Sequence, residues 1–411
     1  MYNRNGRGWE YFDYQIASID KAKRKEHAKF LKRIDFDMVI VDEAHKLKNK
    51  KTLNWKFVNS LNKKYCLLLT ATPIQNNLRE LYNLISIIYP DLYNNFKDFK
   101  NKYKADKHTV KKSNSLQNDL KQVMVRNHHQ ETLLDFSERH IKQIIVELTS
   151  AEKDLYKKVT KYVQQEYSLR KNKNKSVLNL LTYQREICSS FQALKRTLAK
   201  KENPDPEISE ILKLCENINI SSKLKKLNTI LEDIDGQVII FTQYRATQEY
   251  IANYLSNQGY DTILFNGGFS SSGKEYIKYI FHQKKDIMVS TEAGSQGINL
   301  QFCNVIVNYD LPWNPMKIEQ RIGRVHRLGQ TQDVLVYNFA TKNTIEEKIL
   351  NILYKKIYLF KEVIGDMQDI VIDYKDNTSF ESNIMQIIGE ADDENELEEK
   401  FNNLISEKVR T

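Results

Sequence analysis

The chain has 411 residues, with 63 Lys and Arg against 53 Asp and Glu and a formal net charge of +10 at pH 7. Its hydrophobic share of 41% can supply the cores of two or three domains, and its mean hydropathy is −0.59. No apolar run reaches the ~20 residues of a membrane span and no signal segment opens the chain, which excludes a membrane protein and predicts a soluble intracellular one. The excess of Lys and Arg over Asp and Glu favours a polyanionic partner.

Metal ligands are not indicated by the cysteines or histidines. The four cysteines lie far apart and are expected to be buried small apolar residues: Cys66, Cys188, Cys215 and Cys303. His128 and His129 fall in a polar stretch without metal-ligand spacing. A nuclease or metalloenzyme therefore has little support.

The first strand signals are two short apolar runs, Met38–Val41 and Tyr65–Leu69, which follow a polar helical stretch at 21–34. Both are predicted to be buried parallel strands. Asp42-Glu43-Ala44-His45 follows the first run, and Thr70-Ala71-Thr72-Pro73 follows the second.

Ligands of open α/β sheets lie beyond the carboxyl ends of the strands, where these two motifs fall. A carboxylate such as Asp42 can hold Mg²⁺ there, and Glu43 can orient or deprotonate a water. The ordinary alternative is that Asp42 caps a helix and Pro73 ends a strand.

The next region, residues 78–138, is predicted to be helical and is followed by a strand at Ile141–Leu148. Residues 151–233 are mostly helical, with a break at Asn203–Pro206. Strands and helices then alternate, which predicts a parallel α/β sheet. The expected strands are Val238–Phe241, Thr262–Phe265, Ile287–Ser290, Val305–Tyr309 and Val334–Phe339. The acidic stretch Glu390–Glu396 predicts helices on a mobile tail.

Two further motifs fall in this region, and the first of them follows a strand. Ser290–Asn299 contains glycines that let a backbone approach phosphate closely, although a loop without function has the same composition. Gln320–Gln330 places Arg324 and Arg327 three residues apart in a predicted helix, and therefore on one face. Arginine suits phosphate binding because its planar fork stays charged, while a solvated basic helix is the ordinary alternative.

A third stretch, Gly268–Glu275, nearly fits the phosphate-loop pattern G-x-x-x-x-G-K-[ST]. Glu275 occupies the position that must offer a hydroxyl to Mg²⁺, and the stretch comes long after Asp42 instead of before it. We therefore reject it as a phosphate loop and expect Lys274 to meet solvent or a nucleic-acid backbone.

The ordered motifs DEAH, TATP, STEAGSQGINL and QRIGRVHRLGQ resemble the Swi/Snf family of DNA-translocating ATPases within the superfamily-two helicases, over about residues 10–365. Leu180–Leu198 is similar to a stretch of bacterial RapA/HepA-type members. The resemblance implies an α/β fold of two RecA-like parallel-sheet lobes with helical insertions. It implies a first lobe at 1–148, a helical connector at 149–220, a second lobe at 221–365 and a helical, acidic tail at 366–411.

The resemblance also implies ATP with Mg²⁺ as the nucleotide and double-stranded DNA, bound independently of sequence, as the partner. The implied catalytic residues are Asp42, which would hold Mg²⁺, Glu43, Arg324 and Arg327. The implied nucleotide-binding residues are His45, Gly297, Gln320, Arg324 and Arg327. Thr70, Ala71 and Thr72 would couple the nucleotide site to DNA. The implied DNA contacts are Gln243, Asn266, Gly267, Gly268, Ser290, Thr291 and Gly294.

The chain departs from the family ahead of Asp42. Only 41 residues precede Asp42, and none forms a phosphate loop, since Gly6-Arg7-Gly8 lacks the lysine and the hydroxyl. We therefore expect an incomplete first lobe. One hypothesis is the C-terminal portion of an ATP-dependent DNA translocase, completed by a separate chain with the N-terminal part of that lobe. The other is a truncated, catalytically inactive DNA-binding remnant. Either is expected in the cytoplasm, associated with the nucleoid.

Overall fold

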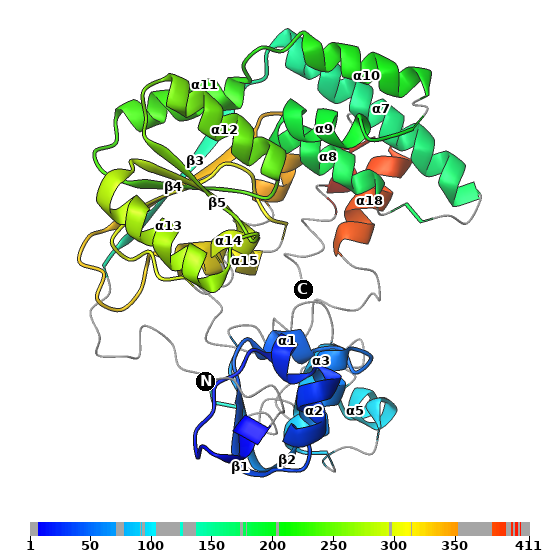
Figure 1. Cartoon of the computed structure of the whole chain (residues 1–411). Helices are drawn as coiled ribbons and strands as arrows, with labels where there is room; N and C mark the ends of the chain where they lie inside the picture. Colours follow the sequence, from blue (N-terminus) through cyan, green and yellow to red (C-terminus); the bar gives the residue numbers. More distant parts are fainter. Residues whose placement is uncertain are drawn as a thin grey trace. The chain divides into compact units, whose positions relative to one another are not determined.

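The computed structural model divides the chain into two compact units, drawn in Figure 1. The first unit contains the described residues between 7 and 125, and the second contains those between 137 and 403. The structure describes residues 7–70, 78–90, 92, 95–103, 124–125, 137–172, 176–177, 179–202, 205–295, 298–313, 315–351, 380–391, 396–397, 399–401 and 403.

The first unit is built on two parallel strands, β1 (Asp35–Val41) and β2 (Asn62–Leu68). Met38 lies opposite Tyr65, and Ile40 lies opposite Leu67. The described helices of this unit are η1 (Arg7–Glu10), α1 (Ile19–Ala22), α2 (Lys25–Leu31), η2 (Ala44–Leu47), α3 (Leu53–Asn59), α4 (Leu78–Ile88) and α5 (Phe96–Tyr103).

The described helices of the first unit cover only one face of this sheet. Its inward side chains, such as Val41 and Leu68, pack with the buried helical residues Leu47, Phe57 and Leu84. The opposite side, which we name the outer apolar face, consists of Met38, Ile40, Tyr65 and Leu67, which are 46–58% exposed. The parallel pairing was predicted correctly, but the expectation of buried strands was wrong. Successive side chains of a strand point to opposite faces, and helices pack on only one of them.

The second unit contains a six-stranded parallel sheet of order β3-β8-β7-β4-β6-β5. Its strands are β3 (Arg139–Val146), β4 (Val238–Thr242), β5 (Thr262–Phe265), β6 (Ile287–Thr291), β7 (Val305–Asn308) and β8 (Val334–Thr341). The predicted strands therefore exist, and their ends differ from the predicted ones by no more than two residues. Strands β4, β6 and β7 are buried at every position, which is why they are apolar runs instead of alternating patterns.

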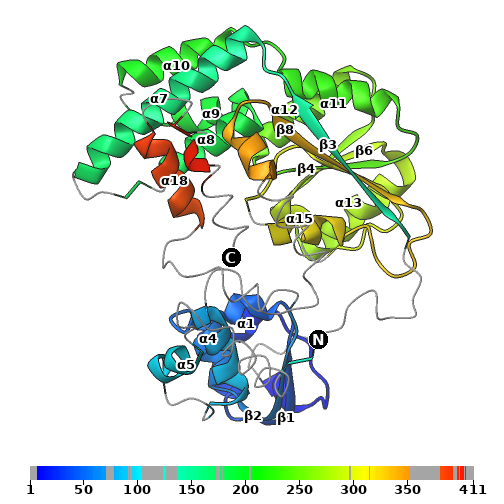
Figure 2. The same ribbon diagram turned by 180° about the vertical axis from the view of Figure 1, so that it is seen from behind.

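Helices cover both faces of this sheet (Figures 1 and 2). Val238 and Ile240 of β4 share a core with Leu227 and Leu255, which belong to α11 and α12. Ile239 faces the other way and joins a core that contains residues of α13 and α15. The described helices of this unit include α7 (Ser150–Asn172), α8 (Leu180–Ser189), α9 (Phe191–Leu198), α10 (Pro206–Glu216), α11 (Ser222–Glu232), α12 (Arg245–Asn257), α13 (Ser271–Lys284), α14 (Glu292–Ser295), α15 (Pro315–Ile322) and α18 (Phe380–Glu390). The predicted α/β class with parallel sheets is confirmed.

No helix in the described part of the chain is both long and apolar enough to cross a bilayer.

The two units do not divide at residue 148, which was the expected end of the first lobe. Strand β3 pairs with β8 over its whole length, with Arg139 opposite Val334, and therefore belongs to the second unit. The helices of the expected connector also pack into that unit, since Leu155 and Leu194 belong to its core. Strand β3 is far in sequence from β8, its partner among the described strands, so local pattern does not reveal which unit it joins.

Helix α18 packs against α7 and is not the mobile tail that its sequence suggested. Ile384, Met385 and Ile388 are buried in the core of the second unit. The Gln164 side chain of α7 donates to the carbonyl of Ala391 at 2.9 Å. Most of the acidic stretch follows this helix, and residues 392–395 lie outside the described residues.

Candidate functional site

The carboxylates of the DEAH motif lie at the carboxyl edge of the two-stranded sheet. The backbone N–H of Leu69 donates to the carbonyl of Val41 at 2.9 Å, and the N–H of Ala44 donates to the carbonyl of Leu69, also at 2.9 Å. These bonds hold the two strand exits together, and Thr70 follows directly. The structure therefore places the DEAH motif beside Thr70, while Ala71 and Thr72 lie outside the described residues.

Glu43 adopts a left-handed backbone conformation, with φ 52° and ψ 46°. Residues other than glycine rarely adopt this conformation, which costs energy and is often found at functional sites. The Glu43 N–H donates to Asp42 Oδ1 at 2.8 Å. Glu43, and not Asp42, is the residue that precedes η2, and its side chain makes no capping bond. The helix-capping explanation for Asp42 is therefore not supported.

His45 completes this cluster. Its Nδ1 lies 3.1 Å from a carboxylate oxygen of Glu43. Burial lowers the pKa of His45 and outweighs the opposing effect of Glu43, so the imidazole is neutral at pH 7. Its neighbours Ala44 and Leu47 are fully buried and anchor this turn.

The second unit contains a buried polar network centred on Asp310, which follows β7. Asp310 Oδ2 accepts hydrogen bonds from Ser189 Oγ at 2.7 Å and Thr242 Oγ1 at 2.5 Å. The backbone N–H of Gln243 donates to Asp310 Oδ1 at 2.9 Å. The network therefore joins the ends of β4 and β7 to the end of α8.

Arg321, on helix α15, also belongs to this network. Its guanidinium donates to Asn308 Oδ1 at 2.9 Å and to the Asp310 carbonyl at 3.0 Å, and it forms an ion pair with Glu292 at 3.3 Å. Sequence reasoning missed Arg321, although a signal was available. Ile318 and Ile322 are buried and define the inner face of α15, on which Arg321 also lies.

The prediction that Arg324 and Arg327 share one helix was wrong. Helix α15 ends at Ile322, and both arginines lie in the turns that follow. The Arg324 carbonyl accepts the Leu300 N–H at 2.9 Å, and Arg327 Nε donates to the Gly323 carbonyl at 2.7 Å. A glycine at position 323 favours this early helix end. Gln320 is half-buried on α15, and Gly297 lies outside the described residues.

Three residues expected to contact DNA are engaged inside the second unit. Ser290 is fully buried in β6, where its hydroxyl donates to the Thr291 carbonyl at 3.1 Å, and Thr291 is buried as well. The Gln243 amide accepts from Arg185 at 2.7 Å and donates to the Leu311 carbonyl at 3.0 Å. The side chains of Ser290 and Thr291 are therefore unavailable to a DNA backbone, because they fill the sheet interior.

Gly294 serves packing. A Cβ at this position would lie 2.6 Å from the Phe265 carbonyl oxygen, so only glycine lets α14 approach the end of β5. Asn266 Oδ1 accepts the Gly268 N–H at 3.0 Å, and Gly267 and Gly268 are exposed. The loop at 266–268 is the part of the expected DNA-binding set that is on the surface.

The near-match to a phosphate loop is the start of α13. Ser270 caps the helix by accepting the Gly273 N–H at 3.2 Å. A helix cap explains the serine and glycine residues of this stretch, which agrees with its rejection as a phosphate loop.

The comparisons with known proteins identify the same family as the ordered motifs. A family described as the SNF2-related domain matches residues 7–193, and the helicase conserved C-terminal domain matches residues 222–329. The uncharacterized ATP-dependent helicase YqhH of Bacillus subtilis (strain 168) is 43% identical over 407 residues, which cover 97% of this chain and 72% of that protein. A probable chromatin-remodeling complex ATPase chain of Oryza sativa subsp. japonica is 30% identical over 364 residues, covering 86% of this chain and 32% of the relative.

Among solved structures, the Sulfolobus solfataricus SWI2/SNF2 ATPase core in complex with dsDNA matches at 25% identity, covering 85% of this chain and 72% of that one. Its TM-score of 0.42 is too low to support an argument about the fold, so family membership rests on the sequence.

Parallel α/β units that carry these motifs in this order define a helicase-like protein of superfamily two. The chain belongs to the Swi/Snf family of ATP-dependent helicases, because it matches both family domains and covers most of a 43% identical relative.

Proposed function

We propose that this chain is the C-terminal portion of a motor that couples ATP hydrolysis to movement on duplex DNA. The observation that carries the proposal is the arrangement of Asp42 and Glu43 at the carboxyl end of β1, beside Thr70. Nucleotide hydrolases of this kind place a magnesium ligand and a water-orienting carboxylate at such a strand end. Gln320, Arg324 and Arg327 are proposed as further nucleotide contacts, and the cytoplasm, at nucleoid DNA, as the location.

Asp42 fits the role of a magnesium ligand. It is exposed, and its Oδ1 accepts the Glu43 N–H, while Oδ2 has no partner among the described residues. Mg²⁺ would neutralise charge on the phosphates, and Glu43 would orient the attacking water. The described residues of the first unit do not form the backbone cradle that a triphosphate also requires.

The outer apolar face supports a partner for the first unit. Parallel sheets are normally covered on both faces, yet Met38, Ile40, Tyr65 and Leu67 remain exposed. We propose that a polypeptide with the phosphate loop packs on this face, as a separate chain or as a further segment. The alternative is a DNA-binding protein without turnover, which the lack of a phosphate loop in the described part of the first unit favours.

Phosphate release with and without duplex DNA tests these proposals. The chain alone should show no release above background, and it should bind duplex DNA. DNA-stimulated release that is lost in Glu43→Gln would mean that a working nucleotide site forms without a partner, which contradicts the proposed incompleteness.

A second arm separates the motor from the inactive protein. The chain is mixed with the part of the Bacillus subtilis relative that it does not cover. Release that is restored by this part, stimulated by DNA and lost in Glu43→Gln, supports the motor. Failure to restore release, while DNA binding persists, supports the inactive protein.

A further inference from the structure

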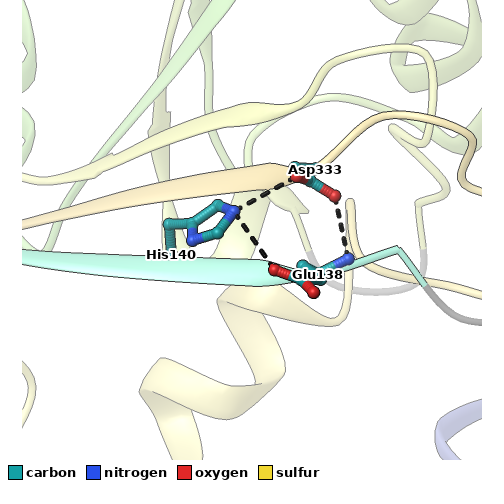
Figure 3. Close-up of side chains that lie close together, drawn as sticks. All are labelled: Glu138, His140 and Asp333. Carbon is teal, nitrogen blue, oxygen red and sulfur yellow. Dashed lines mark hydrogen bonds and ion pairs between the residues drawn. The ribbon is translucent and has the colours of Figure 1, made fainter.

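Three potential metal ligands meet at the edge of the second unit's sheet, next to the Gln320–Gln330 motif, whose His326 ring lies 2.8 Å from the Ser137 carbonyl. Figure 3 shows Glu138 and His140, from the start of β3, and Asp333, from just before β8, pointing toward one another. We propose that these residues bind a divalent transition-metal ion of the Zn²⁺ type. The proposal does not depend on the motor function.

The backbone itself places these side chains together. Arg139 pairs with Val334, so the preceding residues, Glu138 and Asp333, are neighbours across the two parallel strands. Glu138 and His140 are two residues apart on an extended chain and therefore share one face. The arrangement follows from strand register, and rotation of individual side chains does not undo it.

The distances suit one small ion. His140 Nε2 lies 3.2 Å from Asp333 Oδ2 and 3.8 Å from Glu138 Oε2, and the three ligand atoms lie within 4.8 Å of one another. Bonds of about 2.0–2.1 Å in a tetrahedral zinc site separate neighbouring ligands by roughly 3.4 Å. Small side-chain rotations would therefore bring all three atoms onto one ion, with water in the fourth position.

Asp333 is held in the required orientation. Its Oδ1 accepts the Glu138 N–H at 3.0 Å, which turns Oδ2 toward His140. The Asn304 amide donates to the Asp333 carbonyl at 3.1 Å and fixes the backbone. Supporting bonds of this kind orient metal ligands and raise affinity.

The local charge also calls for a cation. Neither Glu138 nor Asp333 forms an ion pair with Lys or Arg in the described structure, and nearby Arg139 pairs with Glu319 at 2.8 Å. A protonated His140 offers one positive charge against two carboxylates, whereas a divalent ion matches both. The imidazole favours zinc-like ions over Mg²⁺ or Ca²⁺, which prefer oxygen ligands.

Such an ion would join the edge strand β3 to the segment that leads into β8. Titration of the full chain with Zn²⁺, followed by calorimetry, tests this, and Co²⁺ absorption reports the ligand set. Asp333→Asn retains an oxygen for the Glu138 N–H, His140→Ala removes the nitrogen ligand, and His282→Ala, at an exposed histidine on α13, is the matched control.

One equivalent of Zn²⁺ should be lost in His140→Ala and retained in His282→Ala. Asp333→Asn should weaken binding roughly tenfold or more, and excess Mg²⁺ should not compete. Unfolding in urea without metal confirms that each variant is folded. The proposal is overturned if the stoichiometry is the same in all three variants, or if the unsubstituted chain binds no Zn²⁺.

Discussion

Arg321 and Asp310 are each only 2% exposed, and together they fix the ends of β7 and α15. A buried ion pair contributes little net stability when intact, because both charges lose their hydration. Removal of one partner is costly, since the other charge stays buried without compensation.

Arg321→Ala should therefore lower the free energy of unfolding by about 3–5 kcal/mol. The loss arises because Asp310 and Glu292 keep their charges without the guanidinium. Urea unfolding followed by circular dichroism measures it. Arg196→Ala is the control, since Arg196 pairs with Glu249 at 2.8 Å on the surface and should cost less than ~1 kcal/mol. Equal losses in both variants would show that the network is not stabilised by Arg321.

Glu186 should make stability depend on pH. Burial raises the pKa of Glu186 to about 7 from its ordinary 4.5, although Thr197 Oγ1 donates to it at 2.6 Å and opposes the shift. The folded state binds this proton more tightly than the unfolded state does. Stability from this group is therefore full below pH ~4.5 and falls by roughly 3 kcal/mol as the pH rises to about 7.

Glu186→Gln keeps an oxygen that accepts from Thr197 and removes the titration. Urea unfolding at pH 5 and pH 8 should show a smaller pH dependence in the variant than in the unsubstituted chain. Parallel behaviour of the two proteins would mean that Glu186 is ionised in the folded state at both pH values.

Single residues were the hardest level to predict from sequence. Asp42, Glu43 and Thr70 could be placed because a strand end fixes the residue after it. Arg324 and Arg327 were misplaced because local spacing cannot show that a helix ends at Ile322. Ser290 was assigned to DNA because the sequence does not reveal where β6 stops.

At the scale of elements, the sheet of the first unit is unusual because both of its faces are apolar, while the described helices of that unit cover only one of them. Exposed apolar surface of this kind often marks an interface. The outer apolar face therefore offers a direct test of a partner.

The double substitution Ile40→Lys with Leu67→Lys should change stability by less than ~1 kcal/mol in total, because both side chains already face solvent. It should abolish any restored phosphate release in the mixing experiment. Leu68→Lys, on the covered face, is the control and should destabilise the first unit, because a charge would enter its core. Restored release in the double variant would exclude this face as the partner's site.

Strand positions were predictable because apolar runs of four to eight residues between polar loops are distinctive. Which face is covered was not predictable. From Met38 to Val41 every residue is apolar, so the sequence alone does not distinguish the exposed side from the packed one.

At the scale of the whole molecule, the net charge of +10 supports binding to a polyanion. Contacts to phosphate release counterions, so affinity should fall steeply with salt. Duplexes of unrelated sequence should bind alike.

Affinity for a fluorescent duplex should drop by at least ~10-fold between 50 and 200 mM salt. Asn266→Asp keeps the acceptor for the Gly268 N–H but adds a negative charge in the exposed loop, and it should weaken binding further. Asn257→Asp, at an exposed position of α12, is the control. Equal affinities of the two variants would argue against DNA contact at this loop.

Organisation at long range escaped prediction because it depends on pairs that are far apart in sequence. Neither the position of β3 nor the meeting of His140 with Asp333 is encoded in any local pattern. Family motifs indicated the parallel units, since three of the four motifs lie at strand ends: DEAH after β1, TATP after β2 and STEAGSQGINL at the end of β6.

The pairing of β3 with β8 has a consequence for synthesis. Glu138 and Asp333 are separated by 195 residues, and β8 is the strand that hydrogen-bonds to β3 in this sheet. At about 5–20 residues per second, a ribosome takes roughly 10–40 s to make β8 after β3. The β3 edge of the sheet therefore cannot form until β8 has been made, so it is completed late in synthesis.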